Sequence, residues 1–234
     1  MPFYDYYDDL AATGIGRAWA MGQARLALEQ IRAAHPGGRT VLEIGPGHGS
    51  FAAICADARY RYTALDINLR LLRAIQSRGH SGVRALIPLL PVATGSYDIV
   101  FASHVIEHNP TYRDAAAFLS ELRRTVTPGG VVAMVAPDYL ALREDFWNCD
   151  YSHGFVTTRR RLRQIMRDCG LEPTRERYVW GPLKDVGGQI AGLTIGSRLA
   201  GQIARGLPGR LGERLYKARL TFARAVLIIG RVPT

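Results

Sequence analysis

TVLEIGPGHG, residues 40–49, is the stretch that decides the fold of this 234-residue chain. Its first five residues, Thr40 to Ile44, are β-branched or apolar apart from Glu43, which is typical of a short buried strand. The glycines that follow predict a tight loop, and the alanine-rich segment 50–58 predicts a helix. A glycine loop between a strand and a helix lets the backbone come close to a bound ligand.

The alternation of strands and helices continues along the chain. Further strands are expected over 61–65, 83–86, 97–102, 131–136, 175–180 and 225–231. Helices are expected over 17–34, 68–78, about 111–126 and 157–169, and Thr127-Pro128-Gly129-Gly130 reads as a turn into the fifth strand. Such alternation predicts an α/β fold whose parallel sheet carries helices on both faces, with ligands at the carboxyl ends of the strands.

Length and composition favour one globular α/β domain, because 47% of the residues are hydrophobic and the length suits a single core. No apolar run approaches the ~20 residues of a membrane-spanning helix, and the polar, aromatic start does not resemble a signal peptide. We therefore expect a cytoplasmic protein. Cys55, Cys149 and Cys169 are widely spaced and odd in number, so we expect them to be reduced and structural.

Positive charge gathers near the end of the chain. The formal net charge is +10. From Lys184 onward the sequence contains nine basic residues and only two acidic ones, Asp185 and Glu213. This basic, glycine-rich segment is expected to form a weak or partner-dependent structure, followed by a helix with Leu211, Leu215, Ala218 and Phe222 on one side. The charge is consistent with an anionic membrane surface, and thus with peripheral attachment at the inner membrane, or with an ordinary solvated surface. Nucleic acid is disfavoured, since no recognition module or interleaved aromatics accompany the charge.

The run from Val41 to Gly49 resembles motif I of the class I S-adenosylmethionine (SAM)-dependent methyltransferases, which has a hydrophobic strand, an acid and Gly-x-Gly-x-Gly. Later segments resemble further motifs of that family, in the family's order: Asp66, Ser96-Tyr97-Asp98-Ile99-Val100, Val105-Ile106-Glu107-His108 and Thr127-Pro128-Gly129-Gly130. The likeness covers residues 38–180 and is greatest to the small-molecule group called methyltransferase types 11 and 12.

The resemblance implies a Rossmann-like, doubly wound, mostly parallel seven-stranded sheet with an antiparallel last strand. It also implies SAM as cofactor, with S-adenosyl-L-homocysteine as product. The implied cofactor-binding residues are Glu43, Gly45, Gly47, Gly49, Asp66, Ile67, Ser103 and His104. Among these, Glu43 and the glycines would lie near the methionine part, Asp66 at the ribose and Ile67 at the adenine. Leu86 stands where many relatives have an aspartate for the adenine amino group, so other groups must recognise the adenine.

The residue patterns and the resemblance together divide the chain into four expected parts. These are an N-terminal helical lid segment, 1–37; a SAM-binding core, 38–182; a basic glycine-rich and helical insert, 183–222; and a final strand of the core sheet, 223–234. Five aromatic residues of the first part either form a lid over the cofactor or are ordinary core or interface residues: Phe3, Tyr4, Tyr6, Tyr7 and Trp19.

Three histidines are candidate catalytic bases, His104, His108 and His153, because an imidazole with a pKa near 6.5 suits proton removal. His153 ends Asp150-Tyr151-Ser152-His153, which resembles a D-x-x-H segment near the acceptor pocket of many relatives. A bracing or surface role is the alternative for each.

Residues 104–108 also fit the H-x-x-E-H pattern of zinc peptidases. The strand before them and Pro110 after them leave too little helix to present two ligands on one face. Some quinone-biosynthesis O-methyltransferases hold a divalent ion with E-x-x-E-H here, but His104 replaces the first acid. We predict no metal, with Glu107 and His108 bracing the loop through hydrogen bonds.

The sequence therefore predicts a SAM-dependent methyltransferase that O-methylates a small molecule or saccharide, including a lipid-linked glycan. Three alternatives remain: a quinone-type or other C- or N-methyltransferase, a non-catalytic scaffold or regulator with the SAM fold, and a nicotinamide-dependent oxidoreductase. The last would more often show Gly-x-Gly-x-x-Gly, and here Ser50 occupies the sixth position.

Overall fold

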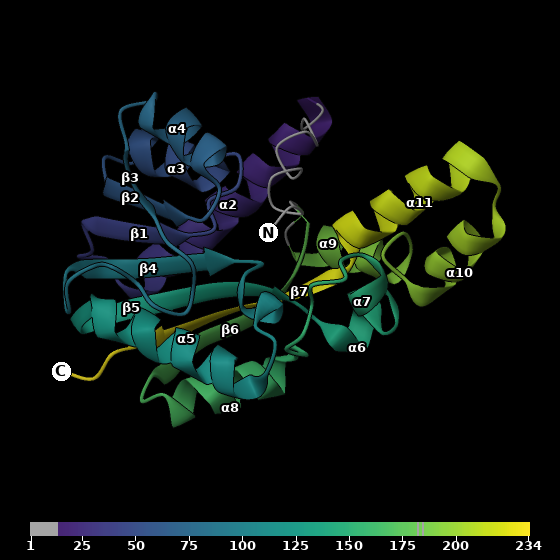
Figure 1. Ribbon diagram of the computed structural model, residues 1–234. Coiled ribbons are helices and arrows are strands. Elements are labelled where there is room, and N and C mark those ends of the chain that lie inside the picture. The colour runs from purple at the N-terminus through teal and green to yellow at the C-terminus, as the bar shows by residue number, and fades with distance from the viewer. Residues whose placement is uncertain (1–13, 182, 184) are drawn as a thin grey trace.

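A single sheet of seven strands forms the centre of the protein (Figure 1). The computed structural model describes residues 14–181, 183 and 185–234. The strand order is β3-β2-β1-β4-β5-β7-β6. The strands are β1 (Thr40–Ile44), β2 (Arg61–Asp66), β3 (Ser81–Arg84), β4 (Tyr97–Ser103), β5 (Val126–Pro137), β6 (Glu172–Trp180) and β7 (Arg224–Arg231).

The direction of the strands confirms the predicted Rossmann-like, doubly wound sheet. Neighbouring strands from β3 to β5 are parallel, whereas β7 is antiparallel to both β5 and β6. The last strand is thus antiparallel, as expected. The order of the strands reverses between β1 and β4, and ligands of such sheets bind outside the carboxyl ends of the strands at this point.

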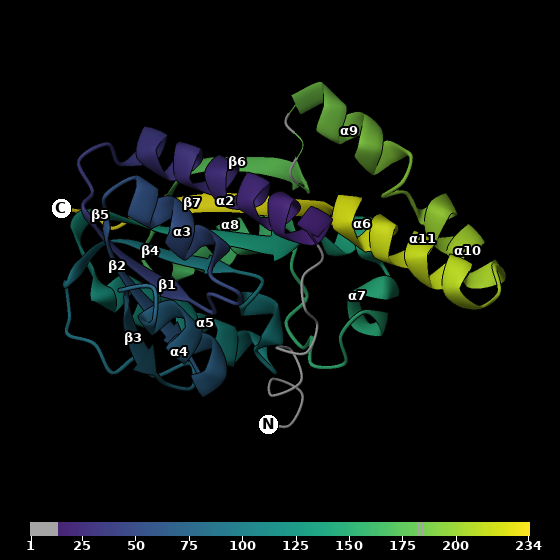
Figure 2. The ribbon, with the colours of Figure 1, turned by 90° about the horizontal axis from the view of Figure 1, so that it is seen from above.

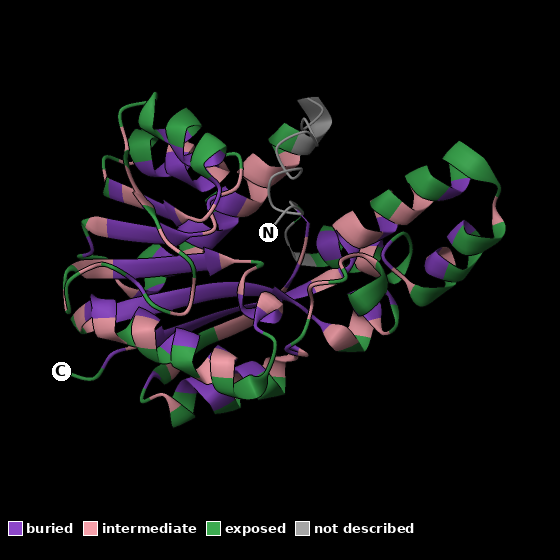
Figure 3. Ribbon diagram, in the orientation of Figure 1, coloured by how far each residue is buried: buried purple, intermediate pink, exposed green. Residues whose placement is uncertain are grey.

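Helices cover both faces of the sheet, as Figure 2 shows from above. One hydrophobic core joins the sheet to α2 (Gly14–Ala34), α3 (Ser50–Asp57) and α4 (Leu69–Gln76). A second core, on the opposite face, joins it to α5 (Tyr112–Thr125) and α8 (Arg159–Asp168). The central strands are purple in Figure 3 because both of their faces are buried.

Side-chain caps fix where several helices begin. The side chain of Asn68 accepts hydrogen bonds from the backbone N–H groups of Arg70 and Leu71 at the start of α4. Thr111 and Asp114 form a capping box at the start of α5, and Thr158 caps α8. A capping residue has non-helical backbone angles, so these helices begin one or two residues later than the sequence ranges suggested.

The expected turn at residues 127–130 is instead part of β5, which begins at Val126. Gly129 has a φ of +76°, and its N–H donates to the carbonyl of Val232, whose own N–H donates to the carbonyl of Gly130. The chain beyond β7 therefore pairs with this segment. Pairing with the C-terminal residues replaces the turn by an irregular strand start.

Residues 185–222 contain three helices beside the sheet: α9 (Asp185–Leu193), α10 (Arg198–Gly206) and α11 (Gly209–Phe222) (Figures 1 and 2). The expectation that Leu211 and Phe222 share the apolar side of α11 was partly wrong. Leu211 is 60% exposed, while Gly212, Arg219 and Phe222 form the buried side. Arg219 is buried because it has an acidic partner in the core, which apolar spacing alone did not predict.

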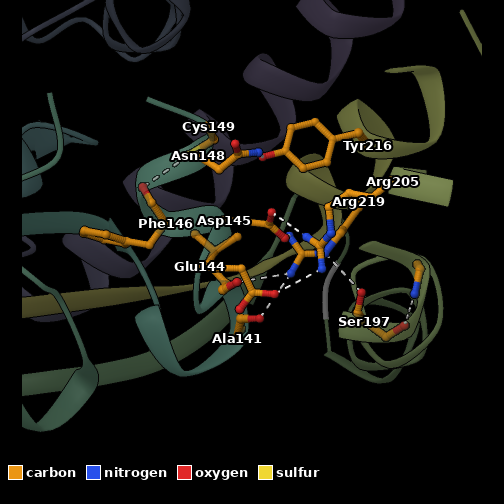
Figure 4. A network of polar contacts seen from close by, with 12 residues as sticks. Ala141, Glu144, Asp145, Phe146, Asn148, Cys149, Ser197, Arg205, Tyr216 and Arg219 are labelled. Carbon is orange, nitrogen blue, oxygen red and sulfur yellow. Dashed lines mark hydrogen bonds and ion pairs between the residues drawn. The ribbon is translucent and has the colours of Figure 1, made fainter. Parts of the chain in front are cut away.

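That partner is Asp145 in the short helix α7 (Asp145–Asn148), shown in Figure 4. Nη1 of Arg219 lies 2.8 Å from Oδ2 of Asp145, and both side chains are only 1% exposed. Arg205 of α10 approaches the other carboxylate oxygen at 2.9 Å, and Nε of Arg219 donates to the carbonyl of Ser197. The ion pairs thus join α10 and α11 to the chain that follows β5 and the short helix α6 (Tyr139–Leu142).

Trp19 packs edge to face on Phe222, with ring centroids 4.6 Å apart, so it lies between α2 and α11. This contact is the interface role that the sequence left open for Trp19, and the lid over the cofactor stays a prediction. Phe3, Tyr4, Tyr6 and Tyr7 lie outside the described residues. All three cysteines are free thiols. Within the part of the chain that the structure describes, no helix is both long and apolar enough to cross a membrane.

Candidate cofactor and acceptor site

The loop after β1 has a backbone that requires glycine. Gly45, Gly47 and Gly49 have φ angles of +67°, +52° and +79°, a region that L side chains rarely adopt. A Cβ atom on Gly45 would lie 2.8 Å from Cγ2 of Val105. The N–H of Gly45 donates to the carbonyl of Leu65, 2.9 Å away, and this bond ties the loop to the end of β2.

A cavity of about 250 Å³ opens beside this loop. It lies between the carboxyl ends of β1 and β4 and helix α2, whose Arg17 and Gln23 line it. The structure places most of the expected cofactor residues in its wall: Glu43, Gly45, Gly47, Ser103 and His104. Gly49, Asp66 and Ile67 are not in this wall. The cavity therefore corresponds to the methionine side of the expected site.

Glu43 lies at the cavity with its side chain almost completely buried. Burial raises the pKa of Glu43 to about 8, although the hydrogen bond that the hydroxyl of Tyr62 donates to it has the opposite effect. Sequence reasoning did not identify Tyr62. The signal lies in the register: Val41 pairs with Tyr62, and Glu43 with Ala64, so all four side chains share one face of the sheet.

Asp66 ends β2 next to the loop, as the sequence predicted. Its Oδ1 accepts a hydrogen bond from the N–H of Asn68 at 2.8 Å. Burial raises the pKa of Asp66, against the effect of backbone hydrogen bonds from Asn68 and Ile67. Ile67 is half-buried beside it, and Leu86, at the position that departs from the family pattern, is 61% exposed.

His104 follows β4 with a left-handed backbone, φ +56°. Its Nδ1 lies 3.2 Å from Oε1 of Glu107, and its side chain is 47% exposed. Partial burial lowers the pKa of His104, but the hydrogen bond to Glu107 and the charge of that carboxylate outweigh this effect, and the pKa is raised. His104 thus joins the cavity wall to Glu107 behind it.

His108 ends the single 3-10 turn η2 (Ile106–His108), and its ring is held by a short chain of hydrogen bonds. Nδ1 of His108 lies 2.7 Å from the hydroxyl of Ser152, and this hydroxyl donates to Asp150 at 2.6 Å. Since the only proton of the Ser152 hydroxyl goes to Asp150, Nδ1 of His108 is the donor of the pair. The neutral ring then has its lone pair on Nε2.

His153 lies against His108, with ring centroids 4.8 Å apart. Its Nδ1 donates to the carbonyl of Phe146, which fixes the proton on that atom as well. The N–H groups of Gly154 and Phe155 donate to the backbone carbonyl of Glu107 and close the loop onto η2. The structure thus brings His108 and His153 together, and Glu107 connects them to His104.

Glu107 is completely buried, and neither of its carboxylate oxygens has a well-aligned hydrogen bond. The predicted brace is made by its backbone carbonyl, which accepts from Gly154 and Phe155, and by the contact of its carboxylate with Nδ1 of His104 at 3.2 Å. Ligand atoms of Glu107, His108 and His153 all lie within 4.8 Å of one another, so these residues could hold a divalent ion. The H-x-x-E-H pattern is not presented on an α-helix, because the structure has only η2 there.

A glycine loop after β1, an acid at the end of β2 and a cavity beside them, on a sheet with an antiparallel seventh strand, define a SAM-dependent methyltransferase. Residues 17–176 match the family model described as a methyltransferase domain. The chain belongs to this family, and SAM is its cofactor. The left-handed glycine loop, the cavity and the buried carboxyl group of Glu43 fit SAM as a ligand.

Two curated relatives illustrate the sequence similarity. An uncharacterized methyltransferase of Mycobacterium sp. (strain JLS) is 38% identical over 101 residues, 42% of this chain and 39% of that protein. The ubiquinone/menaquinone biosynthesis C-methyltransferase UbiE of Rubrivivax gelatinosus is 33% identical over 130 residues, 54% of this chain and 48% of that protein. The chain thus spans less than half the length of these relatives.

Solved structures show the same fold. A proposed sarcosine dimethylglycine methyltransferase of Galdieria sulphuraria superposes with a TM-score of 0.67 at 13% identity, over 90% of this chain and 85% of that one. A SAM-dependent methyltransferase of Archaeoglobus fulgidus gives a TM-score of 0.60 at 19% identity, over 89% and 94% of the two chains. At these identities the similarity concerns the fold and not the acceptor.

Proposed function

We propose that the protein transfers the methyl group of SAM to a hydroxyl of a small molecule or saccharide, with His108 as the base. The observation that carries this proposal is the chain from His108 through Ser152 to Asp150, which keeps a proton on Nδ1 and leaves Nε2 able to accept one. Burial, assisted by the nearby His153, lowers the pKa of His108 against the effect of Glu107. The ring is therefore neutral, and able to act as a base, at neutral pH.

The other residues hold and align the reactants. Glu43 and the loop from Gly45 to Gly49 would hold the methionine part of SAM, and Asp66 would accept hydrogen bonds from the ribose hydroxyls, beside Ile67. Bound SAM supplies an electrophilic methyl group on a sulfonium and leaves as S-adenosyl-L-homocysteine. Ser103 and His104 line the cavity where an acceptor would approach. Nε2 of His108 takes the proton of the acceptor hydroxyl as its oxygen forms the new bond to carbon.

Alignment supplies much of the rate in such a transfer, since holding two reactants in line removes an entropic cost of several kcal/mol. Loop 150–155 therefore matters for the rate as much as the base does, because it helps to hold His108 and His153 in place. A Cβ atom at Gly154 would lie 2.6 Å from the carbonyl of Asn109, so only glycine lets this loop approach η2 so closely. The loop and η2 together carry His108 and His153.

A saccharide carried by a lipid is the acceptor class that suits both the hydroxyl chemistry and the basic helices α10 and α11. Such an acceptor would place the protein at the inner membrane surface. C-methylation is a second candidate. It is favoured by one observation, the 33% identity to a protein named as a quinone-biosynthesis C-methyltransferase.

The experiment is to incubate the protein with SAM labelled in its methyl group and with lipid and water-soluble extracts, and to identify the labelled product by mass spectrometry. We expect a methyl ether. With the true acceptor, His108→Ala should lower kcat by about 10²- to 10⁴-fold, while SAM binding by calorimetry stays unchanged. His35→Ala, at a histidine between the end of α2 and the start of β1, is the matched control. A methyl group on carbon, or full turnover by His108→Ala, would contradict the proposal.

A further inference from the structure

Helix α2 forms one wall of the cofactor cavity. Most of its cavity residues recur at a spacing of three or four, which puts them on one side of the helix: Arg17, Ala20, Gln23, Ala24 and Ala27. Three of these residues are alanines, whose short side chains fill little of the space. The two long polar side chains of this wall, Arg17 and Gln23, therefore border a cavity that α2 leaves open.

Arg17 brings a positive charge to this wall. It is the only lysine or arginine among the described residues that line the cavity. Its side chain is exposed, and within the part of the chain that the structure describes no carboxylate pairs with its guanidinium. The guanidinium can therefore serve a ligand without first breaking an ion pair.

The start of α2 is held in place by Trp19, two residues after Arg17. Trp19 packs on Phe222 at the end of α11 (Figure 2). A step of two residues turns an α-helix by about 200°, so Trp19 faces α11 while Arg17 faces the cavity. The aromatic contact thus keeps the cation at the cavity wall.

The methionine part of SAM carries an ammonium and a carboxylate on the same carbon atom. The ionised side chain of Glu43 suits the ammonium, but the carboxylate needs donors of its own, because burial of an unpaired charge is costly. Two N–H groups of the glycine loop are already used, since Gly45 donates to Leu65 and Gly49 to Pro46. A guanidinium matches a carboxylate well, because it offers two parallel N–H donors together with a charge.

We propose that Arg17 binds the carboxylate of SAM, while Glu43 binds the ammonium. Helix α2 is then part of the cofactor site, although none of the motifs lies on it. Arg17 would make the site select a cofactor that keeps its amino-acid carboxylate. The inference rests on SAM as the cofactor and, for the ammonium, on the proposed role of Glu43. It does not depend on the acceptor or on the base.

The experiment is titration calorimetry of the full chain with SAM and with decarboxylated SAM, which keeps the sulfonium and the amino group but lacks the carboxylate. We expect the wild type to bind SAM about 10- to 100-fold more tightly than decarboxylated SAM. Arg17→Gln should weaken SAM by a similar factor and should not weaken decarboxylated SAM. Arg17→Lys should keep part of the preference, because an ammonium keeps the charge but not the two parallel donors.

Arg25→Gln, at an exposed arginine of α2 that does not line the cavity, is the matched control and should bind both ligands as the wild type does. Retained binding of decarboxylated SAM by Arg17→Gln would show that the fold persists. An unchanged affinity of Arg17→Gln for SAM, or an equal loss for both ligands, would overturn the proposal. Neither measurement involves an acceptor, so a failure of the proposed O-methylation would leave this result standing.

Discussion

Glu43 and His108 are uncharged at neutral pH in the free protein, for the same physical reason. Burial raises the pKa of Glu43 to about 8 and lowers the pKa of His108. In each case removal of water disfavours the charged form more than the neighbours restore it. The residue types and motifs were visible in the sequence, but the protonation states depend on burial and on neighbours such as Asp66 and His153, which come close only in the folded chain.

The raised pKa of Glu43 predicts that SAM binding releases a proton. The carboxylate form suits the positively charged amino group of the ligand, so binding at pH 7 should convert Glu43 from neutral to charged. The affinity should rise as the pH increases from 6 toward about 8, by nearly tenfold per unit where one whole proton is released. Calorimetry in buffers of different ionisation enthalpy measures this proton.

Glu43→Gln has no proton to release, so its calorimetric enthalpy should not depend on the buffer. If wild-type binding at pH 7 shows the same lack of dependence, Glu43 does not ionise when the ligand binds.

The neighbours of His108 predict the acid limb of the pH profile. The charges of Glu107 and Asp150 raise the pKa of His108, while burial, His153 and His104 lower it more. A base loses activity as the pH falls through its pKa, so the limb should lie below the ordinary value of 6.5. Asp150→Asn keeps an acceptor for Ser152 but removes a charge, and should move the limb to still lower pH. If the acid limb of kcat moves to higher pH in Asp150→Asn, another group is the base.

At the scale of single elements, the sequence predicted those with a strong local signal. The strand 40–44 and the strand at 225–231 appear within one residue of the expected bounds, because their apolar residues pack into the two cores. The glycine-rich segment from 183 onward was expected to be weakly structured, yet it contains α9 and α10. Glycine disfavours an isolated helix, but here it permits close packing against Trp180 and Arg219, which no local pattern reveals.

Two glycines of α10 therefore have opposite predicted effects. Gly201→Ala places a methyl group 2.4 Å from Nε of Arg219 and should destabilise the protein by about 1–3 kcal/mol. At Gly206 a Cβ atom meets nothing within 4 Å, so Gly206→Ala should be neutral or stabilising by up to about 1 kcal/mol. Unfolding in urea measures both free energies. Equal effects of the two substitutions would mean that Arg219 does not pack against α10 as described.

At the scale of the whole molecule, the order β3-β2-β1-β4-β5-β7-β6 brings together residues that are far apart in the chain. The motifs predicted this sheet because the glycine loop, Asp66 and residues 105–108 come at or just after the ends of strands, and the carboxyl ends of parallel strands share an edge. The contacts of the C-terminal helices were not predictable, since the pair of Asp145 and Arg219 joins residues 74 positions apart and leaves no periodic pattern. The same applies to the packing of Trp19 on Phe222.

The central claim is that the glycine loop after β1 and Asp66 at the end of β2 together bind SAM. The most direct measurement is titration calorimetry of the protein with SAM and, separately, with NAD⁺. We expect one SAM per chain and no heat with NAD⁺. Asp66→Ala should weaken SAM by about 10- to 100-fold, as expected for lost hydrogen bonds to a charged group. Absence of SAM binding, binding of NAD⁺ in its place, or an unchanged affinity in Asp66→Ala would contradict the account.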